Sequence, residues 1–246
     1  MALIEGADAW SADGNETGVV VVHGFTGSPR SVRPWGEHLA DAGYSVEVPR
    51  LPGHGTQWQE ANATRWQDWY AEVDRAFTRL QGKCEKVFVT GLSMGGTLAL
   101  RLAEEKGDAL SGIVIVNPSV HTERLDRFLL PVLHRLLPGW PGITNDIKKE
   151  NVDEGGYDKI PLKAMSSLSD LWRVVKKDID LVHQPLLLYR SVEDHVVEPS
   201  NSEWIMQHVR SPMRTEVLLE HSYHVATLDH DAPIIFDGTV DFIKAN

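Results

Sequence analysis

The chain has 246 residues, ordinary apolar and charged fractions and a formal net charge of -11, which suits one large domain whose acidic surface repels nucleic-acid phosphates. The single cysteine, Cys84, excludes an intrachain disulfide, and residues 1–10 lack the basic start and apolar run of a signal peptide, so we expect a cytoplasmic protein. No uninterrupted apolar run approaches the length of a membrane span.

Along most of the chain, short β-branched runs alternate with longer amphipathic segments. We expect strands at residues 19–22, 46–49, 87–89, 113–116, 186–189 and 217–219. We expect helices at residues 31–42, 64–80, 93–105 and 200–209, and a last helix that opens with Pro233. This alternation predicts an α/β fold, with a mostly parallel central sheet and helices on both faces.

Residues 119–169 interrupt this rhythm, because they contain no convincing strand. Seven apolar side chains recur there at helical spacing, and a Pro-Gly pair ends the pattern: Leu125, Phe128, Leu129, Val132, Leu133, Leu136 and Leu137. A connection of about fifty residues is unusually long, and such insertions commonly serve as lids or binding loops. We predict a single domain, 1–246, with a cap inserted at approximately 119–169. The alternative is a crossover helix with a long loop.

The strongest motif is Gly-Leu-Ser-Met-Gly at residues 91–95, which follows an expected strand and opens an expected helix. In this context a Gly-x-Ser-x-Gly sequence holds its serine on a sharp turn with the hydroxyl exposed, and the glycines let neighbouring chain pass closely. The start of the following helix offers free N–H groups and positive potential. The motif predicts Ser93 as a nucleophile and the N–H of Met94 as an oxyanion donor.

A serine hydroxyl needs a base, and the chain order typical of this architecture is serine, acid, histidine. Asp194 and His224 each follow an expected strand, at the strand ends where open α/β sheets gather their active-site groups. Glu193 is an alternative acid, and the alternative bases are His195, His221 and His230. Spacing alone leaves these alternatives open.

A second oxyanion donor is expected from the loop after the first central strand, where His-Gly-Phe-Thr-Gly occupies residues 23–27. The glycines let the backbone turn its N–H groups inward, and we assign this role to the N–H of Phe25. We interpret His23 and His54 as residues that hydrogen-bond or pack under the loops. The chain has no Walker-type loop, dinucleotide fingerprint or His-Glu-x-x-His motif, and we expect neither a metal nor a cofactor.

Taken together, these motifs resemble those of the bacterial monoacylglycerol lipases and related small carboxylesterases of the α/β-hydrolase superfamily. The resemblance rests on blocks at residues 23–27, 49–56, 89–97, 193–197 and 222–229, which occur in matching order over nearly the whole chain. It implies a triad of Ser93, Asp194 and His224, with oxyanion donors from Phe25 and Met94.

The resemblance also implies a small cap over a tunnel that accepts an acyl chain. In the family an acidic cap residue is associated with recognition of the glycerol head. The matching position falls at Asp158, where the family pattern has a glutamate, and Ile147 is expected as an apolar contact at the tunnel mouth.

The sequence thus predicts a serine hydrolase that cleaves carboxylic esters, with monoacylglycerols or similar acyl esters as the expected substrates. The alternatives are a thioesterase or an esterase of acylated or methyl-esterified sugars, and, from another class, an inactive lipid-binding protein. We expect a small ester substrate, no nucleic-acid partner, transient contact with lipid aggregates through the leucine-rich cap face, and a monomer or weak homodimer. Burial of that face against the rest of the domain is the alternative to lipid contact.

Overall fold

The computed structural model describes residues 2–124 and 130–246. In this part of the chain, seven strands form one sheet in the order β1-β3-β2-β4-β5-β8-β9. The strands are β1 (Trp10–Ala12), β2 (Thr17–Val22), β3 (Ser45–Val48), β4 (Lys86–Leu92), β5 (Gly112–Val116), β8 (Leu186–Ser191) and β9 (Arg214–Leu219). Every neighbouring pair is parallel except β1 with β3. The predicted α/β fold is confirmed, and β1 is an edge strand too short to predict.

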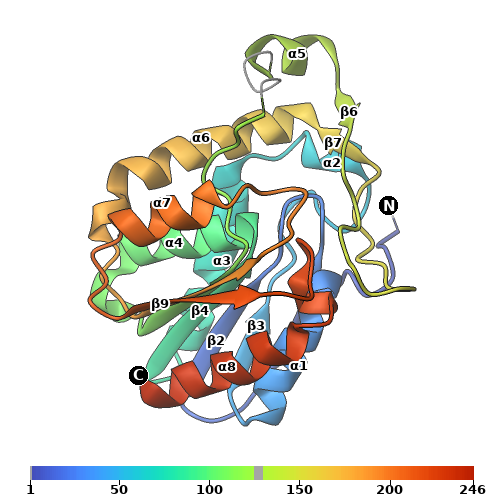
Figure 1. Cartoon of the computed structure of the whole chain (residues 1–246). Coiled ribbons are helices and arrows are strands. Elements are labelled where there is room, and N and C mark those ends of the chain that lie inside the picture. The colour runs from blue at the N-terminus through green and yellow to red at the C-terminus, as the bar shows by residue number, and fades with distance from the viewer. Residues whose placement is uncertain (1, 125–129) are drawn as a thin grey trace.

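Helices cover both faces of the sheet, as the sequence pattern predicted (Figure 1). The helices are α1 (Arg33–Asp41), α2 (Trp58–Ala61), α3 (Trp66–Gln81), α4 (Met94–Lys106), α5 (Leu130–Leu136), α6 (Leu162–Asp178), α7 (Ser200–His208) and α8 (Ala232–Ala245). Helices α3, α4, α6 and α7 pack on one face, whereas α1 and α8 pack on the other.

Strand β2 shows why the central strands are apolar throughout. Val20 and Val22 belong to the core under α3 and α4, whereas Val19 and Val21 belong to the core under α1 and α8. Successive side chains of a strand point to opposite faces, so a strand with helices on both sides needs an apolar residue at every position. This double burial fixes the central strands, and the carboxyl ends of β2, β4, β8 and β9 lie along one edge of the sheet.

The chain between β5 and α6 departs from the layered pattern. It contains α5 and two short strands, β6 (Gly139–Pro141) and β7 (Lys159–Pro161), which pair antiparallel with each other. Figure 1 shows α5 standing beyond α6, outside the layered core. The expectation of no strand in this segment was therefore wrong, because three residues are too few to show a strand period.

Helix α6 makes the crossover back to the sheet, and it starts inside the range expected for the insertion. Its buried face follows helical spacing through Ala164, Leu168, Leu171 and Val175, a signal that the sequence contained. Of the apolar face expected for the cap, Leu125, Phe128 and Leu129 lie outside the described residues. Among the described residues, no helix is both long and apolar enough to cross a bilayer.

Candidate active site

Ser93 lies on a sharp turn between β4 and α4, with φ 56° and ψ -117°. A non-glycine residue rarely adopts a positive φ, and such strain is typical of a nucleophile that must project from a strand-to-helix turn. The glycines at 91 and 95 make the turn possible. A Cβ on Gly91 would lie 2.3 Å from the main chain of Gly95, and one on Gly95 would lie 2.2 Å from the carbonyl oxygen of Val22.

The side chain of Asp194, in the loop after β8, receives three hydrogen bonds. Its Oδ1 accepts the N–H groups of Val196 and Val197, each at 2.8 Å, and its Oδ2 accepts Nδ1–H of His224 at 2.8 Å. Burial raises the pKa of this carboxyl, but the charge and hydrogen bond of His224 and the two backbone donors outweigh burial and hold the pKa below its usual value. Asp194 is therefore built to remain ionised.

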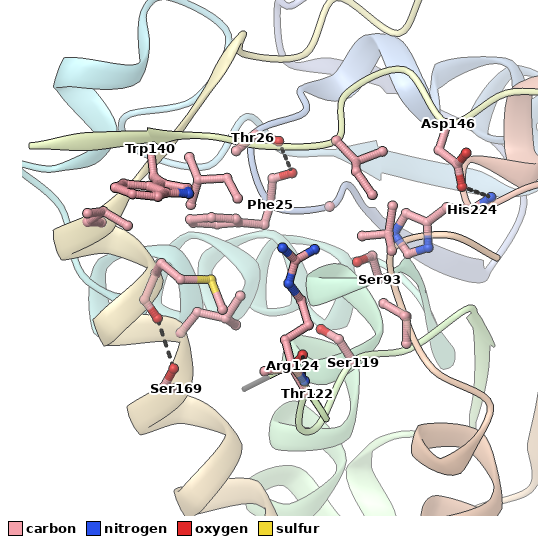
Figure 2. Close-up of a pocket in the computed structure, with 18 of the residues that line it drawn as sticks. Phe25, Thr26, Ser93, Ser119, Thr122, Arg124, Trp140, Asp146, Ser169 and His224 are labelled. Carbon is pink, nitrogen blue, oxygen red and sulfur yellow. Dashed lines mark hydrogen bonds between the residues drawn. The ribbon is translucent and has the colours of Figure 1, made fainter. Parts of the chain in front are cut away.

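The imidazole of His224 is 8% exposed in its side chain. Burial lowers the pKa of His224, but the charge and hydrogen bond of Asp194, together with the charges of Glu154 and Asp146, raise it above the ordinary histidine value. The hydrogen bond to Asp194 uses Nδ1, which leaves Nε2 as the nitrogen available to accept a proton. Figure 2 shows Ser93 next to this ring in the pocket that both residues line.

The alternative acid and bases lie elsewhere on the surface. Glu193, His221 and His230 are exposed, and the ring of His195 donates from Nδ1 to Asp146. The structure thus brings Asp194 and His224 together and leaves the alternatives outside the pocket lining.

The loop after β2 lies directly against Ser93, since a Cβ on Gly24 would come within 3.3 Å of the Ser93 Cβ. His23 fixes this loop: its Nδ1 pairs with the carbonyl of Gly24 at 2.9 Å, and its Nε2 accepts the N–H of Leu51 at 3.2 Å. Burial holds the pKa of His23 well below its ordinary value, as this neutral tautomer requires. Within the described chain, no acceptor is found for the N–H groups of Phe25 and Met94.

A cavity of about 360 Å³ opens beside these groups. Ser93, His224 and Asp146 gather at one end of it, and Trp140 lies at the other (Figure 2). Between the two ends the walls are mainly apolar, with Phe25 from the loop after β2, Ile143 from the segment between β5 and α6, and Met165 from α6. The cavity therefore joins a polar reaction centre to a space that suits an acyl chain.

Comparisons with known proteins agree with this geometry. A family model described as serine aminopeptidase, S33, matches residues 14–231. A thermostable monoacylglycerol lipase from Bacillus sp. (strain H-257) is 40% identical over 242 residues, which cover 98% of this chain and 95% of that protein. The chain belongs to the bacterial monoacylglycerol lipase and carboxylesterase family of the α/β-hydrolases.

Two further relatives support the assignment to this hydrolase family. A carboxylesterase from Bacillus subtilis (strain 168) is 26% identical, and the match covers 94% of each chain. The solved structure of a metagenome-derived lipolytic enzyme superposes with a TM-score of 0.96 at 38% identity, covering 100% of both chains. The protein is a serine hydrolase that acts on carboxylic esters.

The two cap residues expected to contact substrate do not line the pocket of this hydrolase. Asp158 is exposed, and Ile147 packs instead against the core shared with α1 and α8. The carboxylates of the lining are Asp146 and Glu154, and its isoleucines are Ile143 and Ile160. The sequence places several acidic residues between 146 and 158 but gives no sign of which of them turn inward.

Glu154 lies beside the loop after β2, and its charge interacts with that of His224. A Cβ on Gly27 would lie 3.6 Å from its Oε2, and its Oε1 accepts the N–H of Asn145 at 2.9 Å. Burial raises the pKa of Glu154, with the Asn145 N–H and the charge of His224 opposing the rise. No group of three or more His, Cys, Asp or Glu side chains in the described residues could hold a metal ion.

Proposed function

We propose that Ser93, His224 and Asp194 form the catalytic triad, with the N–H groups of Phe25 and Met94 as the oxyanion hole. The Asp194–His224 hydrogen bond of 2.8 Å and the strained serine beside the imidazole support this assignment. His224 takes the hydroxyl proton as Ser93 attacks the ester carbonyl, and Asp194 stabilises the imidazolium that forms. The two N–H groups stabilise the negative oxygen of the tetrahedral intermediate.

The same groups complete the acylation step and then catalyse hydrolysis of the acyl-enzyme. The tetrahedral intermediate collapses, the alcohol leaves with a proton from His224, and the acyl group stays on Ser93. Water then gives a proton to His224 and attacks the acyl-enzyme carbonyl, and when this second tetrahedral intermediate collapses, His224 returns the proton to the oxygen of Ser93 and the acid leaves.

The substrate class that we propose is the monoacylglycerols and similar acyl esters. The observation that carries this proposal is Glu154, a carboxylate that faces the reaction centre of an otherwise mainly apolar cavity. Its Oε1 accepts the N–H of Asn145, and its charge interacts with that of His224. A glycerol head offers free hydroxyls that can donate to such a carboxylate, whereas a methyl ester offers none. The name of the Bacillus sp. (strain H-257) relative points to the same substrate.

The test compares a monoacylglycerol with the methyl ester of the same acid in wild type and in Glu154→Gln. We expect Glu154→Gln to lower kcat/KM for the monoacylglycerol by about tenfold, because a hydrogen bond to a charged group contributes roughly 1.5–3 kcal/mol. The rate on the methyl ester should stay within about twofold on the same argument.

Asp158→Asn is the matched control, since Asp158 is an exposed carboxylate outside the lining. It should leave both rates unchanged. Equal losses on both esters in Glu154→Gln, or a wild type with no glycerol preference, would instead indicate a general carboxylesterase.

We further propose that the segment expected as an insertion at 119–169 forms the cap of a single domain. The segment supplies Trp140, Ile143 and Glu154 to the pocket, and α6 continues the fold from Leu162. Leu136 and Trp140 are 72% and 46% exposed, which supports transient contact of the cap with lipid aggregates.

The single free cysteine suits action in the cytoplasm, and the proposed oligomeric state is a monomer or weak homodimer.

A further inference from the structure

The carboxylate of Asp146 lies beside the proposed triad without belonging to it. Its Oδ2 accepts the backbone N–H of His224 at 3.1 Å and the backbone N–H of His195 at 3.2 Å. Its Oδ1 accepts Nδ1–H of the His195 ring at 2.8 Å. The side chain of Asp146 is only 9% exposed, and Figure 2 shows it next to the main chain of His224.

The donors come from the two loops that carry the proposed acid and base. His195 directly follows Asp194 in the loop after β8, and His224 is the base itself in the loop after β9. Two of the three donors are main-chain groups, so Asp146 fixes the loops themselves and not only a side chain. Hydrogen bonds to an ionised carboxylate are about twice as strong as neutral ones.

The chain around Asp146 holds the carboxylate in place. Asn145 adopts φ 57°, and its side chain exchanges hydrogen bonds with Glu154 N–H and the carbonyl of Val152. The carbonyl of Asp146 also accepts the N–H of Val225, the residue after the proposed base. The cap segment is thus attached to the base loop by main chain as well as by side chain.

We propose that Asp146 is a positioning residue of the triad, which ties the Asp194 loop to the His224 loop and links both to the cap segment that lines the pocket. This inference rests on the triad proposed above. Its consequence is that the segment carrying Ile143, Asn145 and Glu154 past the substrate also sets the alignment of the base. A cap that shifts away from the pocket would release the carboxylate that aligns His224.

The charge of Asp146 gives this role a signature that simple packing lacks. Burial lowers the pKa of His224, while the charges of Asp194, Glu154 and Asp146 raise it. The other charged groups around Asp146 are His195, whose pKa its hydrogen bond raises, and Glu193, which pairs with Lys148. Loss of the Asp146 charge should lower the pKa of His224, so the acid limb of kcat/KM against pH should move to lower pH.

The experiment uses two substitutions on the full chain with a soluble p-nitrophenyl ester. Asp146→Asn keeps the shape and one acceptor oxygen but removes the charge, and we expect the acid limb to move to lower pH with a small loss in kcat. Asp146→Ala removes the tie between the loops, and we expect kcat to fall by about 10–100-fold with KM nearly unchanged, the usual scale for misaligned catalytic groups.

Asp229→Asn is the matched control. Asp229 also joins the cap segment to the base loop, through the N–H groups of Lys148, Lys149 and Tyr223, but it has no bond to His224 or His195. It should lower Tm and leave the acid limb where it is. An acid limb that stays in place in Asp146→Asn, or moves equally in Asp229→Asn, would overturn the proposal.

Failure of the triad itself would look different. Ser93→Ala should abolish both turnover and labelling by a fluorophosphonate, and retention of either would remove the triad on which the inference rests. If Ser93→Ala is inactive while Asp146→Ala, confirmed as folded by circular dichroism, keeps wild-type kcat, only the role of Asp146 is overturned.

Discussion

The edge of the central sheet and the cap segment contribute to the same pocket in contrasting ways. Ser93 and His224 are 9% and 7% exposed; Ser93 follows β4, which is buried on both faces, and His224 follows β9 at the edge of the sheet. On the cap, Ile143 is 47% exposed and Trp140 is 46% exposed. Within the described residues, β6 pairs only with the three residues of β7. Hydrophobic packing of β4 thus places Ser93, whereas polar contacts such as those of Asn145 and Asp146 hold the pocket wall of the cap segment and the loop of His224.

This contrast predicts that chemistry and specificity can be changed separately. Substitutions at the sheet edge should remove turnover on every ester, because all substrates share one reaction centre. Substitutions of cap residues that line the pocket without contacting the His224 loop should change which esters react, and leave small soluble esters almost unaffected.

The largest effect is expected for Ser93→Ala. Without the nucleophile, kcat on any ester should fall by about 10⁵-fold or more, while the circular dichroism spectrum stays unchanged. Ser202→Ala is the matched control, since Ser202 is also buried but lies in α7. Wild-type turnover in Ser93→Ala would show that the reaction takes place away from this turn, and the contrast between the sheet edge and the cap would no longer hold.

A smaller effect is expected for Ile143→Ala on the cap. The substitution removes apolar surface from the cavity wall, so kcat/KM for long-chain esters should fall by about fivefold, in line with the partial burial of this side chain. The rate on p-nitrophenyl acetate should not change. Ile147→Ala is the control, because Ile147 packs on the core instead of the cavity. A chain-length preference that changes equally in both variants would show that the cap does not select substrates by the length of the acyl chain.

The smallest effect is expected at the outer surface of the cap. Leu136→Glu places a charge on a side chain that is 72% exposed, and we expect about a twofold or greater loss of co-sedimentation with zwitterionic phospholipid vesicles, since roughly one buried leucine is lost from the contact. Leu181→Glu, also exposed but at the opposite end of α6, should bind as wild type does. No binding of the wild-type protein would end the idea of a lipid contact.

Much of the molecule could be predicted because its signals are local. Alternation of apolar runs with amphipathic segments predicted the central strands and the covering helices, since each strand or helix must match its own burial. The motif at 91–95 predicted a serine on a strand-to-helix turn, because the neighbouring main chain leaves no room for a side chain at either glycine.

The sequence by itself determined the parallel sheet, the sharp turn at Ser93 and the chain order of Ser93, Asp194 and His224. Only the tertiary structure decided that Glu154, and not Asp158, faces the pocket, and that Asp146 joins the two loops beside the proposed triad. The reason is physical. Whether a strand is buried can be judged from its own side chains. The direction of a carboxylate on an irregular segment such as that of Asp146 depends on hydrogen-bond donors that lie 49 and 78 positions away in the sequence.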